Sequence, residues 1–181
     1  MCNYKVRRMQ VKNQDYFVTQ LMNNAGTIRS LVQNIGDEQA RWKPQPESWS
    51  ILEVINHLYD EEREDFRQRL DYLLHRPSEP FPVIDPQGWV TSRQYNQRNL
   101  AASLNNFLQE RQQSLNWLRS LTKPNWAELY DRPPLGFVSA GDMLAAWLAH
   151  DLLHLRQLIE LHWAYLAQQA RPIALDYAGG W

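Results

Sequence analysis

Two histidines, His150 and His154, are four positions apart in residues 147–154 (WLAHDLLH). On a helix, side chains at positions i and i+4 share a face and are about 6 Å apart along the axis. The other residues on this face are mostly apolar: Met143, Trp147, Leu158, Leu161 and Tyr165. Imidazoles directed into a core need polar partners, and a divalent metal ion would satisfy two nitrogens at this spacing. We therefore ask whether the chain supplies a third ligand.

The spacing by itself leaves other interpretations open. A His-x-x-x-His pair also arises by chance, and a buried imidazole can hydrogen-bond to a carbonyl or a tyrosine. With Asp151 the pair reads His-Asp-Leu-Leu-His, one methylene shorter than the His-Glu-x-x-His of zinc proteases. A protease is not favoured, because the shorter side chain reaches less far and Asp151 lies to one side of the apolar stripe.

A third candidate ligand, His57, lies 93 positions before His150 (150 − 57), at the edge of a stripe that begins at Ile51. Glu61 follows one turn later on nearly the same line. It is a candidate acid or base, although an exposed surface glutamate is an equal alternative. The charged run 61–65 (EERED) is expected to be mostly a solvated face, with Glu61 best placed to point inward.

Apolar residues recur at helical spacing in four segments, about 11–35, 51–74, 91–121 and 140–169. Ser50 followed by Glu53 predicts a capping box at the second of these. Residues 76–90 contain four prolines and, at ~3.3 Å per residue, could span about 50 Å, which would let the second and third helices run parallel. We predict an all-α four-helix bundle over a single domain, 1–181. In its tail, 171–181, Tyr177 and Trp181 could pack back onto the bundle.

The composition excludes several classes of protein. The chain has 19 basic and 20 acidic side chains, and its net charge of −1 does not indicate binding to nucleic acid or to an anionic membrane. Cys2 is the only cysteine, so no disulfide can form within the chain. The sequence shows no signal peptide and no apolar run of transmembrane length. The expected location is the cytoplasm.

Short motifs around these histidines resemble the DinB/YfiT-like superfamily. Trp49-Ser50 followed by Glu53, His57 and Leu58 is similar to its second-helix signature, and His150-x-x-x-His154 followed by Gln157 to its fourth-helix signature; Trp42-x-Pro44 also fits. The resemblance implies an up-down-down-up bundle, a homodimer, and a divalent metal held by His57, His150 and His154. It also implies the activities found in the superfamily: transferases that use low-molecular-weight thiols, a thiol-dependent isomerase, and hydrolases.

Other polar residues receive supporting roles. Gln157 and Asp151 are candidates to hold an imidazole by its other nitrogen, Gln157 being the better placed. His75 and His162 lie outside the motif and are expected to be structural or surface residues. Trp42 and Trp49 are expected to pack the loop before the second helix. Trp89, Trp126 and Trp181 are in or beside loops and are candidates for a pocket mouth.

We therefore expect an enzyme that acts on a small-molecule substrate through zinc or nickel, by S-transfer from a low-molecular-weight thiol or by hydrolysis. The alternative is a non-catalytic metal- or ligand-binding domain in a stress response or in dimerisation. A metal-free bundle with hydrogen-bonded histidines also stays open.

Overall fold

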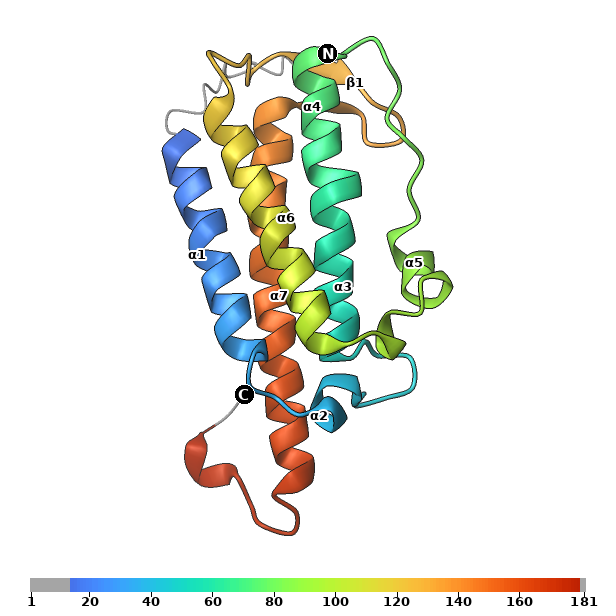
Figure 1. Ribbon diagram of the computed structural model, residues 1–181, viewed down its shortest axis with the longest axis vertical. Helices are drawn as coiled ribbons and strands as arrows, with labels where there is room; N and C mark the ends of the chain where they lie inside the picture. Colours follow the sequence, from blue (N-terminus) through green and yellow to red (C-terminus); the bar gives the residue numbers. More distant parts are fainter. Residues whose placement is uncertain (1–13, 180–181) are drawn as a thin grey trace, which may run out of the picture.

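Four long helical segments lie alongside one another in the computed structural model, which describes residues 14–179 (Figure 1). They are α1 (Gln14–Val32); α3 (Ile51–Glu61), continued by the π-helical turn η1 (Glu62–Phe66) and α4 (Arg67–His75); α6 (Leu100–Ser120); and α7 (Ala140–Gln169). The second and third segments run parallel, and α1 and α7 run the opposite way (Figure 1). The predicted four-helix bundle with an up-down-down-up course is confirmed.

Short elements occupy the connections. They are α2 (Asp37–Arg41), α5 (Pro86–Ser92), the 3₁₀ turns η2 (Tyr95–Gln97) and η3 (Asp176–Ala178), and the strands β1 (Leu129–Asp131) and β2 (Phe137–Ser139). The strands pair antiparallel, with Leu129 opposite Ser139, inside the segment expected to be a loop.

Some predicted helix bounds are wrong. The third helix begins at Leu100 rather than at 91, because Gln94 adopts a left-handed conformation (φ 51°) and Asn99 caps the helix with its side chain. The first helix ends at Val32 rather than at 35, and the expected turn at its start, 11–13, lies outside the described residues.

Both helices that carry the candidate ligands begin with a capping box. Ser50 and Glu53 form the predicted box at α3, and Ser139 and Asp142 form a second one at α7. In such a box each side chain accepts from the other residue's backbone N–H, which satisfies two otherwise free donors and fixes where the helix begins.

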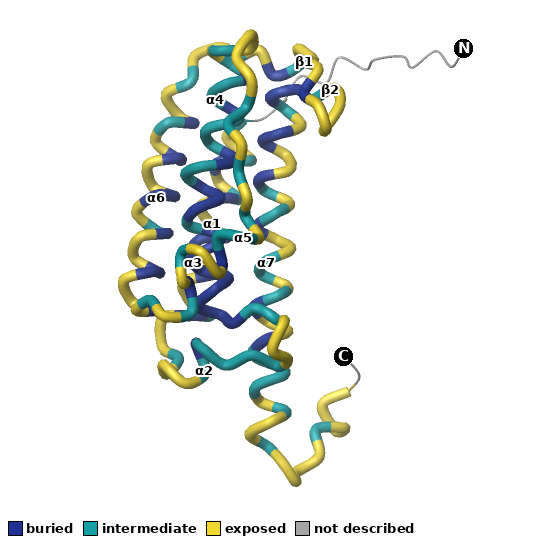
Figure 2. Tube along the Cα trace, turned by 90° about the vertical axis from the view of Figure 1, so that its right-hand side faces the viewer, coloured by how far each residue is buried: buried dark blue, intermediate teal, exposed yellow. Residues whose placement is uncertain are grey.

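The core consists of two apolar clusters, one in each half of the bundle. Inward-facing buried residues follow each long helix (Figure 2). Between the clusters every helix contributes a buried polar side chain: Asn24 from α1, Glu62 from η1, Arg111 from α6 and Asp151 from α7. The middle of the bundle is therefore a polar layer, and the candidate ligands lie at this level.

The end of α7 and the tail project from the bundle (Figure 1). Tyr177 is fully exposed, so the expectation that it packs back is wrong, and Trp181 lies outside the described residues. No helix within residues 14–179 is both long and apolar enough to cross a membrane.

Candidate metal centre

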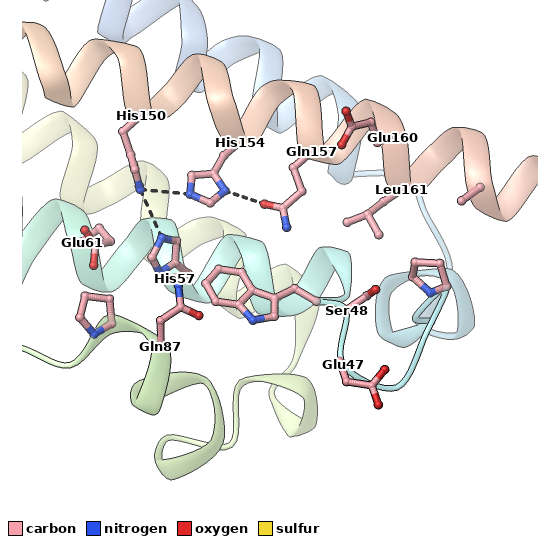
Figure 3. Close-up of a pocket in the computed structure, with 14 residues that line it drawn as sticks. Glu47, Ser48, His57, Glu61, Gln87, His150, His154, Gln157, Glu160 and Leu161 are labelled. Carbon is pink, nitrogen blue, oxygen red and sulfur yellow. Dashed lines mark hydrogen bonds between the residues drawn. The ribbon is translucent and has the colours of Figure 1, made fainter. Parts of the chain in front are cut away.

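Three imidazoles converge between α3 and α7 (Figure 3). Nε2 of His150 is 3.3 Å from Nε2 of His57 and 3.0 Å from Nε2 of His154. Nitrogens that bind one tetrahedral zinc at 2.0–2.1 Å are about 3.3–3.4 Å apart, so the spacing matches the donor set of one ion. Among residues 14–179 these histidines are the only group of three or more His, Cys, Asp or Glu side chains gathered closely enough to hold a metal.

Hydrogen bonding alone explains this cluster poorly. A proton on Nε2 of His150 can make one well-aligned bond, either to His57 or to His154, but not both. Nδ1 of His57 is buried and has no hydrogen-bond partner among the described residues. A cation that accepts a lone pair from each ring removes the conflict between the three Nε2 atoms.

Gln157 orients one ring of the cluster. Its Oε1 lies 2.8 Å from Nδ1 of His154, one turn away on α7. If Nδ1 carries the proton and donates to this oxygen, Nε2 of His154 presents its lone pair to the centre.

We expect Gln157→Ala to weaken the affinity for a divalent metal by about 10–100-fold, because the ring loses the bond that fixes its tautomer. Gln157→Glu, which keeps the acceptor, should retain the affinity. Isothermal titration of metal-free protein with Zn²⁺ measures both, with the exposed Gln168→Ala on the same helix as control. Equal affinities for Gln157→Ala and the wild type would contradict the role of Gln157 in orienting His154.

Burial keeps the imidazoles neutral. Together with the neighbouring histidines, it lowers the pKa of His57 to about 2 and that of His150 to about 3. Burial also lowers the pKa of His154, partly offset by Gln157. Protons therefore do not compete with a metal for these nitrogens near neutral pH.

The charged run that begins at Glu61 is not the solvated face that the sequence suggested. Glu61, Glu62 and Asp65 are all buried. The π-helical turn η1 adds a residue to the helical turn and changes which side chains face inward, a feature common at functional sites. Glu61, the residue expected to point inward, lines the same pocket as the histidines.

Glu61 and Asp65 form a buried carboxyl pair. The two carboxyls interact directly, and such a contact is favourable only when one of them keeps a proton. Oε1 of Glu61 has no hydrogen-bond partner among the described residues. Burial and then the nearby Asp65 raise the pKa of Glu61 to about 9, while Arg69, 2.8 Å from Asp65, opposes the shift. Near pH 7 Glu61 is therefore a neutral acid with a proton to give.

We expect the free energy of unfolding of the metal-free protein to fall as pH rises from about 7.5 to 9. The folded-state pKa of Glu61 is raised above its unfolded value of 4.5, so in this pH range the unfolded state binds fewer protons at Glu61 than the folded state does. Raising the pH therefore lowers the free energy of unfolding. Above about pH 7.5 the histidines are almost entirely neutral in both states and add little slope.

In urea melts, Glu61→Gln should flatten this decline and be more stable than wild type at pH 9 by on the order of 1–2 kcal/mol. The exposed Glu128→Gln is the matched control. A decline that persists in Glu61→Gln would show that another group titrates.

Asp151 does not hold an imidazole, which corrects the role expected for it. Its two carboxylate oxygens accept from the guanidinium of Arg111 at 2.7 and 2.8 Å. The same guanidinium donates to Glu62 at 2.8 Å. Burial by itself lowers the pKa of Arg111, but the two carboxylates outweigh it and raise that pKa. The guanidinium of Arg111, a residue to which the sequence pattern assigned no role, joins α6, η1 and α7 at the level of the histidines.

The pocket in front of the triad has a volume of about 780 Å³. One wall is the crossover connection, where Pro86 and Gln87 at the start of α5 line the pocket. Arg93, just after α5, binds Asp60 of α3 at 2.7 Å and fixes this wall on the bundle. The open side of the triad therefore faces a space large enough for a small molecule.

The tryptophans at the pocket are not those expected. Trp49 lines it, with its ring 4.8 Å from that of His57 and parallel to that of His154. Trp126 instead belongs to an apolar cluster, and Trp89 packs under a guanidinium; Trp181 lies outside the described residues. Trp49, expected only to pack the loop before α3, is therefore also part of the site.

The remaining histidines have ordinary structural partners. His75 lies 2.8 Å from Asp71, one turn earlier on α4. Nε2 of His162 is 2.9 Å from the carbonyl oxygen of Leu31. These contacts agree with the expectation that His75 and His162 are structural or surface residues rather than metal ligands.

Fold and site together define a class: four-helix bundles with a histidine triad between the second and fourth helices. The model of the DinB superfamily matches residues 20–158, which include all three histidines. The chain belongs to this superfamily.

The fold is shared with a solved structure from Bacillus subtilis. YfiT, described as a probable metal-dependent hydrolase with an unusual four-helix bundle topology, superposes with a TM-score of 0.74 over 87% of this chain and 91% of its own, at 19% identity. A search of curated proteins gives no match.

Proposed function

We propose that this protein is a metal-dependent enzyme that activates water or a low-molecular-weight thiol to attack a small electrophilic molecule. The observation that carries the proposal is the convergence of three neutral imidazole nitrogens at the wall of an open pocket. Three protein ligands with a free coordination position are typical of catalytic metal sites, whereas structural sites have four. The description of YfiT as a probable metal-dependent hydrolase supports the same class.

His57, His150 and His154 would hold a divalent ion, zinc or nickel by ligand type. Bound there, the ion would act as a Lewis acid and lower the pKa of a water or thiol at the open position. Because the three imidazoles are neutral, they leave the charge of the ion uncompensated, which favours an anionic nucleophile.

The other residues of the pocket have separate tasks. Gln157 keeps Nε2 of His154 directed at the centre. Glu61, protonated near neutral pH, can donate its proton to the group that leaves the substrate and can later recover one from the nucleophile. Trp49 and the start of α5 line the pocket and would contact a bound substrate.

The test uses full-length protein purified without chelator or a metal-binding tag. Elemental analysis should find about one divalent metal per chain. Metal-loaded protein should then accelerate either hydrolysis of p-nitrophenyl acetate or conjugation of 1-chloro-2,4-dinitrobenzene with at least one of cysteine, glutathione and bacillithiol. Metal-free protein should not. Stoichiometric metal without either activity would favour the non-catalytic alternative.

We further propose a cytoplasmic homodimer. These two points rest on the composition and on the family rather than on contacts within the chain. Light scattering during size-exclusion chromatography should give twice the mass of 21.4 kDa. A monomer over the micromolar range would overturn the dimer.

A further inference from the structure

The charges that line the pocket are all of one sign. The carboxylates of Glu47 and Glu160 line it together with the neutral acid Glu61, and among its described lining residues there is no lysine or arginine. Figure 3 shows Glu61 beside the triad at one end, and Glu47 and Glu160 on opposite sides of the other end. We call the latter the outer end.

The outer end is open to a ligand. Glu47, in the loop before α3, is exposed and forms no ion pair with another described residue. Glu160 on α7 pairs at 3.3 Å with Arg156, but both side chains are largely in solvent, where such a pair contributes about 0–1 kcal/mol. Neither carboxylate is neutralised by a buried partner.

An aromatic surface connects the two ends. Trp49 lines the pocket between the triad, which its ring contacts, and the loop that carries Glu47. The face of an indole attracts cations through its quadrupole, by about 0.5–2 kcal/mol. Aromatic rings combined with carboxylates are a common means of recognising ammonium groups.

The inner end shows that the pocket is built to meet a ligand. The side chain of Glu61 is 96% buried (4% exposed), lines the pocket and has an oxygen that accepts no hydrogen bond among the described residues. A buried polar atom left without a partner is costly, so a ligand group that reaches it gains affinity.

We propose that the pocket binds an organic cation, with a primary or quaternary ammonium group over Trp49 and between Glu47 and Glu160, while its reactive end lies at the triad. This inference rests on the proposed function. It names the substrate class: a small amine or ammonium compound rather than a carboxylate or phosphate ester.

The first arm of the test compares three thiols that bind the metal in the same way but differ in the charge at the other end of the molecule. Co²⁺-loaded protein is titrated with 6-amino-1-hexanethiol, 6-mercapto-1-hexanol and 6-mercaptohexanoate, whose shared thiol head binds the metal and changes its absorption. We expect the ammonium compound to bind at least 10-fold tighter than the carboxylate. The difference should shrink at high salt, because exposed charges are screened. In Glu47→Gln/Glu160→Gln most of the preference should disappear, whereas it should persist in the distant Glu128→Gln.

A second arm needs no metal. Hexylammonium, 1-hexanol and hexanoate are titrated into metal-free protein, and the indole N–H signal of Trp49, assigned through Trp49→Phe, is followed by NMR. Only hexylammonium should shift it at low millimolar concentration. Three equal affinities in both arms, or a preference unchanged in the double variant, would overturn the inference and leave the proposed function standing. Absence of Co²⁺ binding would count against the proposed function, and the metal-free arm would then decide the cation site alone.

Discussion

Replacing His150 with alanine is expected to abolish stoichiometric metal binding and, with it, the activity. His150 is the ligand whose Nε2 lies close to both other rings, at 3.3 and 3.0 Å. Its loss should lower metal affinity by more than about 100-fold, beyond the effect of removing a residue that only orients a ligand. Elemental analysis after gel filtration and Zn²⁺ titration measure the change.

The matched control is His162→Ala on the same helix. It removes an imidazole that hydrogen-bonds to Leu31 and Gln39 rather than to the triad, so metal content should stay at one per chain. Circular dichroism should show the same helix content in both variants. Unchanged metal content in His150→Ala would exclude the triad as the binding site.

Replacing Arg111 with methionine is expected to destabilise the protein by about 3–5 kcal/mol, because two buried carboxylates lose their counter-ion. The side chains of Arg111, Glu62 and Asp151 are 2%, 1% and 1% exposed. Asn24 and Trp147 also donate to these carboxylates, at 3.4 and 2.9 Å, but neither carries a charge. Urea denaturation monitored by tryptophan fluorescence measures the loss.

Two comparisons distinguish the effect of losing the buried ion pairs from the effect of changing the side chain's shape. Arg119→Met, two turns later on α6 and exposed, should change stability by less than about 0.5 kcal/mol. Adding Glu62→Gln and Asp151→Asn to Arg111→Met should recover part of the loss, since no charge then stays buried alone. A stability of Arg111→Met equal to that of Arg119→Met would show that the cluster is not what holds the middle of the bundle.

The long helices and two of the three candidate ligands followed from local patterns. Apolar spacing, capping residues and the proline-rich crossover act within a few residues, so they can be interpreted without knowing what packs against what. The i, i+4 spacing of His150 and His154 needed only a helix. Placing His57 opposite them needed the family resemblance, because helix order alone does not specify which faces meet.

What escaped prediction depends on contacts between distant elements. Arg111 falls on the apolar stripe of α6 between Phe107 and Leu115, and this interruption was the available signal. Its buried partners, however, come from η1 and α7. The π-helical turn that begins at Glu62 had no local signal, and Glu62 and Asp65, expected on a solvated face, are buried. Trp49 was assigned to loop packing because nothing local shows that its ring meets His57.

The most direct test of the metal centre is anomalous X-ray diffraction at the absorption edge of the metal found by elemental analysis. Crystals should come from protein purified without chelator or a metal-binding tag. The expected result is one peak bonded to Nε2 of His57, His150 and His154 at about 2.0–2.2 Å, with a coordination position open to the pocket. A peak elsewhere, a fourth protein ligand that closes the site, or protein that binds no divalent metal would contradict the account.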